Sequence, residues 1–390
     1  MKSLSLSLSD FCTSRWALTA FLALSAVTLS SREGLANEFD GTGSSAVATA
    51  SDPANDSTRY LVAFTLQGYN VVEVGSFTSA GGISCNYPVG LVQTTGFPAY
   101  IGGQAVVAAS SPTLTSNRLL FVTLYTGSSP VVGHVMMLTH SGSDSCAGWN
   151  GSWTEVYASS GHNPVSAPAA TTFSSGGNVY DYVAVRVYDS GASSYYMDVA
   201  YRKNGGSFTW DTSLTGTDWG SQPALTAYIN DVYLFGVSAS DHSVVLENHS
   251  TAFNSSTGQL TWNSSTYTGV SFVNGGGLYY ASEACSATAN TSTVLVVCGD
   301  NQSPIHYWAN VYNGSNWSSA TTWYDQGNVP FVDGGSTWYD DTRPSAGFYS
   351  DYGNSTHWML LGACNTPHNF HFFDESDYTG SSWTSWARRL

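Results

Sequence analysis

The chain has 390 residues, of which only 10 % are charged, and its formal net charge at pH 7 is −16. With 27 acidic residues against 11 Lys and Arg, it has few cations for neutralising phosphates, so nucleic acids and acidic membrane surfaces are not expected partners. Ser, Thr, Gly, Asn and Tyr, which favour strands and turns, take the place of charged residues, and no stretch after residue 40 keeps a helical apolar period. The composition therefore predicts an all-β fold.

The N-terminus has the pattern of a secretion signal. Basic residues precede an apolar run from Trp16 to Leu29, and small residues end at Ala36. We therefore expect residues 1–36 to be a signal peptide, with cleavage near Ala26 as the alternative, and residues 37–44 to be a linker in a protein that is secreted. An uncleaved membrane anchor is the alternative, but it needs about 20 apolar residues and the run is shorter.

Two sequence markers recur in step through the rest of the chain. A tryptophan follows a turn of small polar residues, in copies 52–66 residues apart, at Trp153, Trp210, Trp262, Trp317 and Trp383. A proline opens a short strand at Pro168, Pro223 and Pro344. Related openings of small apolar residues occur at 45–50, 104–109 and 277–281. Together the markers define six repeated units, the first of which has no tryptophan.

Each unit carries four short apolar or alternating segments separated by turn residues. In the fourth unit these segments are 224–228, 231–237, 243–247 and 260–262. Six units of four strands predict one six-bladed β-propeller over residues 45–390, with five or seven blades as alternatives. A pair of β-sandwiches is the competing architecture, but sandwiches do not require a tryptophan at constant phase.

The cysteines indicate structural roles. Cys285 and Cys298 bracket a hairpin, so a cross-strand disulfide fits their spacing in an oxidising compartment. Removal of Cys12 with the signal leaves an odd number, so at least one cysteine stays free or pairs between chains. No cysteine has tight ligand spacing, and His368 and His371 would point to opposite faces of a strand. No metal and no cofactor are therefore expected.

Asn-x-Ser/Thr triplets recur along the chain, among them those that begin at Asn248 and Asn254. They predict a glycoprotein if the host has the glycosylation machinery. The alternative is that a chain rich in Ser, Thr and Asn forms such triplets by chance.

The third repeat reads as a proline opening at 166–169, an apolar strand at 182–188, a tyrosine-rich strand at 195–201 and a Ser-x-x-Trp turn at 207–210. In this order the repeat resembles the blades of secreted propeller lectins of the fucose-binding and related bacterial types. The resemblance implies sugar sites between adjacent blades, held by an aromatic face with Arg and Glu. Here the Arg and Glu pair is not repeated at a fixed position, which does not support fucose specificity. The ligand candidates are the five repeat tryptophans together with Arg186 and Arg343.

Aromatic residues make up 14 % of the chain, and their flat faces suit the C–H side of a pyranose. Weak sites repeated around a ring would gain avidity for a surface that carries many identical sugars. We therefore predict a non-catalytic, lectin-like protein that binds glycans or a cell-surface or matrix polymer. Under the alternative interpretation, the tryptophans pack outer strands and bind nothing.

Two other classes of function stay open. A secreted glycoside hydrolase or lyase would need carboxylates near the propeller axis, where two acids flank the scissile bond. Its candidate residues are Asp52, Glu283, Asp340 and Asp341, at or near the ends of first strands. A structural or adhesion protein would need no small ligand at all.

Overall fold

The computed structural model divides into two units, residues 1–39 and 40–390, and every described residue belongs to the second. The backbone is described in the strands named below and in most of residues 152–263. Side chains are described at 119–125, 132–139, 152–157, 161–211, 219–229, 231–240, 247–263, 285–289, 293–298 and 311–312. The predicted signal peptide and linker lie outside the described residues. Within the described part, no helix is long and apolar enough to cross a bilayer.

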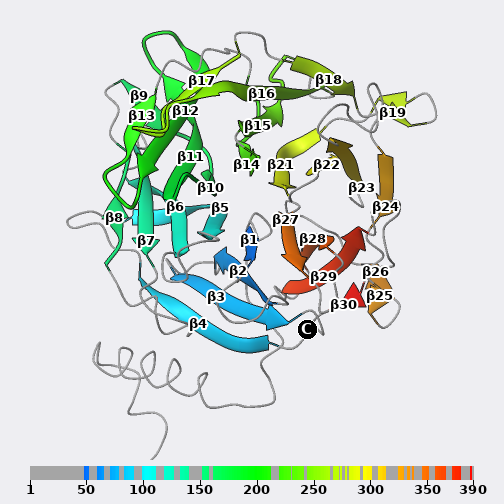
Figure 1. Cartoon of the computed structure of the whole chain (residues 1–390). Coiled ribbons are helices and arrows are strands. Elements are labelled where there is room, and N and C mark those ends of the chain that lie inside the picture. The colour runs from blue at the N-terminus through cyan, green and yellow to red at the C-terminus, as the bar shows by residue number, and fades with distance from the viewer. Residues whose placement is uncertain are drawn as a thin grey trace, which may run out of the picture. The chain divides into compact units, whose positions relative to one another are not determined.

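The described strands form six main antiparallel sheets, each built from strands that follow one another in the chain (Figure 1). The first contains β1 (Ala48–Ser51), β2 (Arg59–Thr65), β3 (Val71–Thr78) and β4 (Ile83–Leu91). The second contains β5 (Ala99–Ser110), β6 (Arg118–Thr126), β7 (Val132–Thr139) and β8 (Thr154–Glu155). The third contains β10 (Ala169–Ser175), β11 (Asn178–Asp189), β12 (Ser194–Lys203) and β13 (Thr209–Asp211), with β9 (His162–Pro164) paired to β11.

The second half of the chain repeats this order. The fourth sheet contains β14 (Ala224–Tyr228), β15 (Asp231–Val237), β16 (Val244–Phe253) and β17 (Leu260–Trp262), with β18 (Tyr267–Ser271) paired to β16. The fifth contains β21 (Ala281–Ala289), β22 (Val294–Asp300), β23 (His306–Tyr312) and β24 (Tyr324–Asn328). The sixth contains β27 (Ser345–Ser350), β28 (Thr356–Asn365), β29 (His371–Tyr378) and β30 (Ala387–Arg388). Two small hairpins follow the fourth and fifth sheets in the chain. The first is formed by β19 (Val273–Asn274) with β20 (Gly277–Leu278), and the second by β25 (Val332–Asp333) with β26 (Ser336–Thr337).

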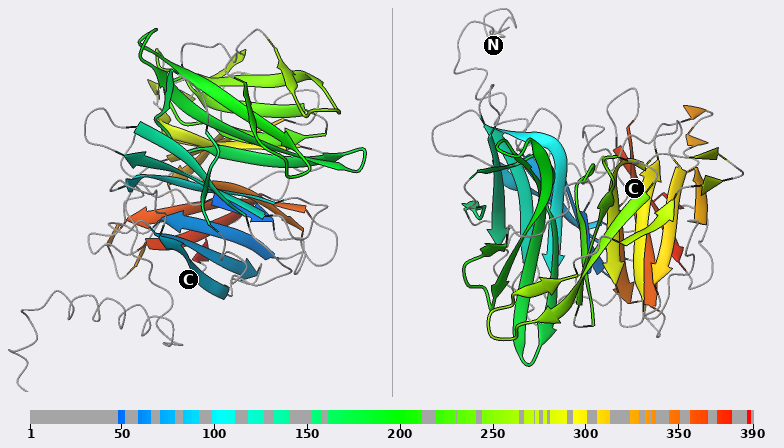
Figure 2. Two further views of the ribbon diagram at one scale, coloured as in Figure 1. Left: turned by 90° about the vertical axis from the view of Figure 1, so that its left-hand side faces the viewer. Right: turned by 90° about the horizontal axis from the view of Figure 1, so that it is seen from above.

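The first strands of successive sheets contact one another in order. Strand β1 contacts β5, β5 contacts β10, β10 contacts β14, β14 contacts β21, β21 contacts β27, and β27 returns to β1. Each sheet is curled, as the strands of the third sheet show in Figure 2. Curled antiparallel sheets whose first strands meet in a closed series are the arrangement of a β-propeller. The prediction of an all-β propeller is therefore confirmed.

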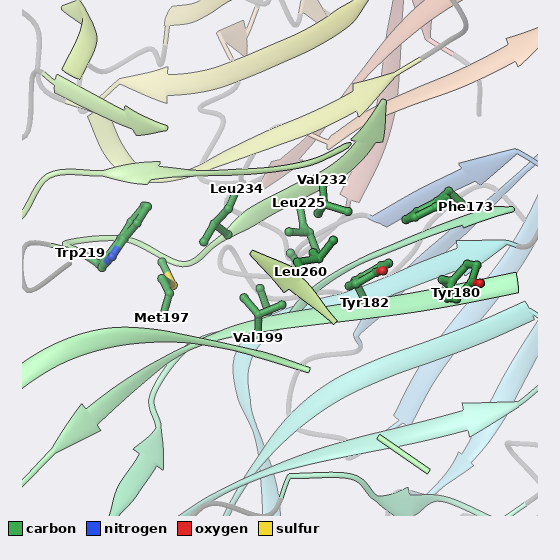
Figure 3. Close-up of a cluster of buried hydrophobic side chains, with 12 residues drawn as sticks. Phe173, Tyr180, Tyr182, Met197, Val199, Trp219, Leu225, Val232, Leu234 and Leu260 are labelled. Atoms are coloured by element: carbon green, nitrogen blue, oxygen red, sulfur yellow. The ribbon is translucent and has the colours of Figure 1, made fainter. Parts of the chain in front are cut away.

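Neighbouring sheets bury apolar side chains between them. Alternate residues of a strand point to opposite faces, so β11 sends Val183 and Val185 toward the second sheet and Tyr180 and Tyr182 toward the fourth. This is why β11 is apolar along most of its length. Figure 3 shows the core between the third and fourth sheets, where Met197 and other side chains of β12 meet residues of β14 and β15.

The proline marker has a hydrogen-bonding function that the sequence did not indicate. Proline has no backbone N–H, so the strand that it opens lacks one ladder donor. In two repeats a serine two positions before the proline compensates, because its hydroxyl donates to the carbonyl of the next residue and accepts a backbone N–H from the second strand. We call this arrangement the serine clip. Its members are Ser166 with Ala167 O (2.8 Å) and Arg186 N (3.1 Å), and Ser221 with Gln222 O (2.9 Å) and Val237 N (2.9 Å).

The predicted disulfide is confirmed. Cys285 and Cys298 lie opposite each other in β21 and β22, and their sulfur atoms are bonded. The two described Asn-x-Ser/Thr positions named above differ. Asn248 is buried in β16, which excludes a glycan there in the folded protein, whereas Asn254 is exposed in the turn after β16.

Candidate functional site

Of the repeat tryptophans that the structure describes, Trp210 and Trp262 lie at junctions between sheets. Trp153, Trp210 and Trp262 are each partly buried. The indole N–H of Trp210 donates to the carbonyl of Val156 at 2.6 Å, and its ring packs edge-on against Tyr157 with centroids 4.7 Å apart. Trp262 packs against the core between the third and fourth sheets. Trp210 and Trp262 therefore contribute to the contacts that join one sheet to the next.

The other predicted site residues are only partly visible. Arg186 is described, and its guanidinium carbon lies 3.9 Å from the centre of the Tyr195 ring. Glu283 lies in β21, but its side chain is outside the described set. The remaining predicted residues lie outside the described residues altogether: Trp317, Trp383, Arg343, Asp52, Asp340 and Asp341.

A carboxyl group with no exposed surface lies between the second and third sheets. It belongs to Asp198 in β12. The hydroxyl of Tyr157 donates to its Oδ2 at 2.7 Å, and Nδ1 of His162 lies 3.0 Å from Oδ2 and 3.1 Å from Oδ1. Burial raises the pKa of Asp198, and the hydrogen bonds from Tyr157 and His162 offset part of that rise. This carboxyl group is thus favoured in its protonated form more than an ordinary aspartate.

The imidazole of His162 connects this buried group to a more exposed carboxylate. Its Nε2 lies 3.7 Å from Oδ2 of Asp189, and the side chains of His162 and Asp189 are 16 % and 26 % exposed. The His162 ring stacks on Tyr196, with centroids 5.6 Å apart and planes 4° from parallel. We call Tyr157, His162, Asp189 and Asp198 the Asp198 cluster. Its geometry places one imidazole within hydrogen-bond distance of one carboxyl group and within ion-pair distance of a second.

Local backbone structure places His162 in this position. Strand β9 pairs with the end of β11, so that His162 lies opposite Asp189. On its other side β9 lies against β7, where the backbone N–H of Gly133 donates to the side-chain oxygen of Asn163 at 2.7 Å. A side chain at position 133 would clash with the backbone of Pro164. Gly133 is therefore required for the close approach that fixes β9 between the two sheets.

Sequence reasoning missed the Asp198 cluster, because His162 is 36 residues before Asp198 and no fixed spacing connects them. One signal was present. Asp198 stands on the same face of its strand as Tyr196 and Ala200, and acids are rarely buried unless they are paired. Among the residues with described side chains, no group of three or more His, Cys, Asp or Glu has an arrangement that could hold a metal ion.

The substitution Asp198→Asn is expected to change how stability depends on pH. Because the folded pKa of Asp198 is raised, the folded state keeps this proton at pH values where the unfolded chain has lost it. Stability should therefore fall as pH rises from the ordinary aspartate value of about 3.9 through the raised pKa, by about 1.4 kcal/mol for each pH unit between them. The substitution should abolish this loss. Urea unfolding of both proteins across a pH series measures it, and parallel curves would contradict the prediction.

No protein-family model matches the sequence, and no curated protein matches it. Several solved structures do. The xylan β-1,4-xylosidase of Bacillus halodurans has a TM-score of 0.42 and 10 % identity, with 91 % of this chain and 82 % of that one covered. The sucrose-6-phosphate hydrolase of Lactobacillus gasseri has a TM-score of 0.39 and 11 % identity, with 94 % and 88 % covered. The α-L-arabinofuranosidase of Lactobacillus brevis has a TM-score of 0.39 and 8 % identity, with 84 % and 86 % covered.

These comparisons correct one expectation from the sequence. The matching structures are enzymes and not lectins, so the resemblance to propeller lectins was wrong, as was the non-catalytic, lectin-like function derived from it. The repeat features that suggested lectins are a proline opening, a tyrosine-rich strand and an outer tryptophan. In the described repeats the proline opening and the outer tryptophan serve strand pairing and contacts between sheets, which many propellers need whatever their function.

Proposed function

We propose that the chain is a secreted glycoside hydrolase on a six-bladed propeller. The observation that carries the proposal is the Asp198 cluster. Glycoside hydrolysis generally requires one acid that gives a proton to the leaving oxygen and one carboxylate that activates water. In the Asp198 cluster the imidazole of His162 lies between two carboxyl groups and can serve as the acid, with Asp189 as the carboxylate. Asp198 is fully buried, Asp189 is partly exposed, and both lie against His162.

The residues of the cluster divide the reaction as follows. Protonated His162 gives the proton on Nε2 to the glycosidic oxygen as the bond from that oxygen to the anomeric carbon breaks. After the leaving group departs, water attacks the anomeric carbon from the vacated side and gives its proton to Asp189. A bridging water returns this proton to His162, because the 3.7 Å between Asp189 Oδ2 and His162 Nε2 is beyond hydrogen-bond distance. Asp198 and Tyr157 are positioning residues, because their hydrogen bonds fix the His162 ring and leave its Nε2 edge toward Asp189.

The blade number in this proposal follows from the closed series of contacts between first strands. Each of the six main sheets supplies one first strand, and the series passes through all six before it returns to β1. Glycans are the proposed substrates because the matching enzymes are named for xylan, arabinofuranoside and sucrose phosphate. Secretion is proposed from the signal-like N-terminus together with the Cys285–Cys298 disulfide, since disulfides persist in oxidising compartments.

The test is hydrolysis of para-nitrophenyl β-xyloside, para-nitrophenyl α-arabinofuranoside and xylan by the mature protein. We expect His162→Ala to lower kcat by a factor of about 100 to 10,000, the usual contribution of a positioned acid or base. The matched control is His249→Ala. His249 also lies beside a carboxylate, with its Nδ1 3.4 Å from Glu247, and it stacks on Tyr233, but it belongs to the fourth sheet. The control should keep full activity.

Two results would contradict the proposal. Failure of the wild-type protein to hydrolyse any glycoside would exclude the function. Hydrolysis that survives His162→Ala but is lost when Asp340 and Asp341 are both changed to Asn would move the reaction to the acids predicted near the axis.

A further inference from the structure

The side-chain amide of Gln222 is buried without a complete set of hydrogen bonds. Gln222 is 9 % exposed, and its Oε1 has no hydrogen-bond partner among the described residues. A buried polar atom without a partner costs about 1–3 kcal/mol. Either a structural contact of this amide or a hydrogen bond to a ligand must therefore compensate for the cost.

The fold does not require the amide. Gln222 is the middle residue of the serine clip that opens β14, and Ala167 is the middle residue of the clip that opens β10. In both clips the serine makes the same two hydrogen bonds, so the main chain has the same partners with either side chain. Ala167 is buried and has no polar side-chain atom to satisfy. Alanine therefore performs the structural role at this repeat position.

Gln222 belongs to the repeat that follows the one carrying His162. His162 lies in β9, shortly before the clip residue Ala167, and Gln222 is the repeat equivalent of Ala167. The strands that follow the two clips lie side by side, because the backbone N–H of Ala227 donates to the hydroxyl of Thr171 at 3.1 Å, across a separation of 56 residues. Gln222 thus stands where one first strand begins, next to the first strand that follows His162.

The same repeat position varies in chemistry. In the sixth repeat the sequence Thr-Arg-Pro corresponds to the clips, which places Arg343 at the position of Gln222 by sequence. Three repeats therefore keep a hydroxyl residue and a proline, with alanine, glutamine or arginine between them. The sequence pattern of the clip thus recurs while its middle residue changes. This is expected if the repeats share a scaffold and the middle residue is adapted to bind a ligand in one of them.

We infer that Gln222 is a substrate-binding residue that hydrogen-bonds a hydroxyl group of a bound saccharide. The inference rests on the proposed glycoside hydrolase function and extends it to a contact with the substrate. The amide torsion of glutamine is broad, so the group can turn to present its oxygen to a ligand. A sugar hydroxyl is a suitable ligand because it donates to the amide oxygen and accepts from the amide nitrogen.

Binding of xylotriose and arabinotriose, measured by calorimetry on the His162→Ala protein to prevent turnover, tests the inference. We expect Gln222→Ala to weaken binding of at least one sugar by about 5- to 10-fold, the loss of one net hydrogen bond. Its melting temperature should stay equal or rise, because an unsatisfied acceptor is removed. Gln222→Glu keeps an acceptor oxygen but loses the donor nitrogen, so it should weaken binding less than Gln222→Ala does. The control is Asn248→Ala, which removes another buried amide whose oxygen has no partner among the described residues but which is not part of a clip.

Each result distinguishes the binding role from a structural one. Unchanged affinity with a lowered melting temperature in Gln222→Ala would assign the amide to the fold and overturn the inference. Failure of both sugars to bind the parent protein would also overturn it. If binding depends on Gln222 while the wild-type protein hydrolyses no glycoside, the inference stands and the proposed function fails. If hydrolysis occurs with the same KM in Gln222→Ala, the proposed function stands and the inference fails.

Discussion

Replacing Arg202 with methionine is expected to lower the free energy of unfolding by about 3–5 kcal/mol, because it leaves a buried carboxylate without its partner. Nε of Arg202 lies 2.7 Å from Oδ2 of Asp181, and the two side chains are only 7 % and 8 % exposed. Thr172 donates to the other carboxylate oxygen at 2.9 Å, and the Arg202 guanidinium lies over the Phe208 ring at 4.6 Å. Urea unfolding at neutral pH measures the loss.

The double variant Asp181→Leu, Arg202→Met is the control for this prediction. Replacement of both charges by apolar side chains of similar size is often neutral or stabilising, since neither charge must then be desolvated. We expect the double variant to recover most of the stability that Arg202→Met loses. A double variant as unstable as the single one would show that packing of Arg202 against Phe208, rather than the unpaired charge, dominates.

The Asp181 pair also clarifies the role of the Asp198 cluster. Asp181 and Asp198 lie on the same face of neighbouring strands, both buried against the second sheet. Asp181 is paired with an arginine, a side chain that stays charged at all ordinary pH values. Asp198 is paired with a histidine and a tyrosine, and histidine changes charge near neutral pH. Asp181→Asn should therefore affect stability without abolishing hydrolysis, which separates the aspartate that supports the fold from the aspartate that positions His162.

Much of the fold could be predicted because the strand and turn pattern of a blade is present within the sequence of each repeat. In the fourth repeat the predicted segments 224–228, 231–237 and 260–262 coincide with β14, β15 and β17. The third segment was predicted at 243–247, but β16 continues to Phe253. It continues through polar residues because its pairing with β15 and β17 satisfies the backbone, whatever the side chains are.

The candidate site could not be predicted in the same way. His162 and Asp198 meet only because β9 pairs with the far end of β11 and is fixed there by the close approach at Gly133. The close approach of Gly133 to Pro164 depends on the packing of two sheets, so no motif or residue spacing in the sequence could predict it. Gln222 was likewise not singled out from the sequence. The repeat marker was defined by the neighbouring Pro223, and the glutamine itself matched no motif.

The second stability prediction concerns the disulfide. Replacing Cys285 and Cys298 together with alanine is expected to lower the free energy of unfolding by about 3 kcal/mol, the value for a closed loop of about 15 residues. The bond closes a short segment, because the two positions are 13 apart in sequence, and both cysteines are buried in the core between the fourth and fifth sheets. Alanine is preferred to serine because a hydroxyl there would be buried.

Reduction separates the contribution of the bond from that of the sulfur atoms. Urea unfolding with and without reductant should show a loss of similar size in the wild-type protein, and the double-alanine variant should respond by that much less. The two strands that carry the cysteines are already paired by the backbone hydrogen bonds of the β21–β22 ladder. The disulfide should therefore act mainly by restricting the unfolded chain. Equal stability of the oxidised and reduced wild-type protein would contradict this and would assign the cysteines to apolar packing alone.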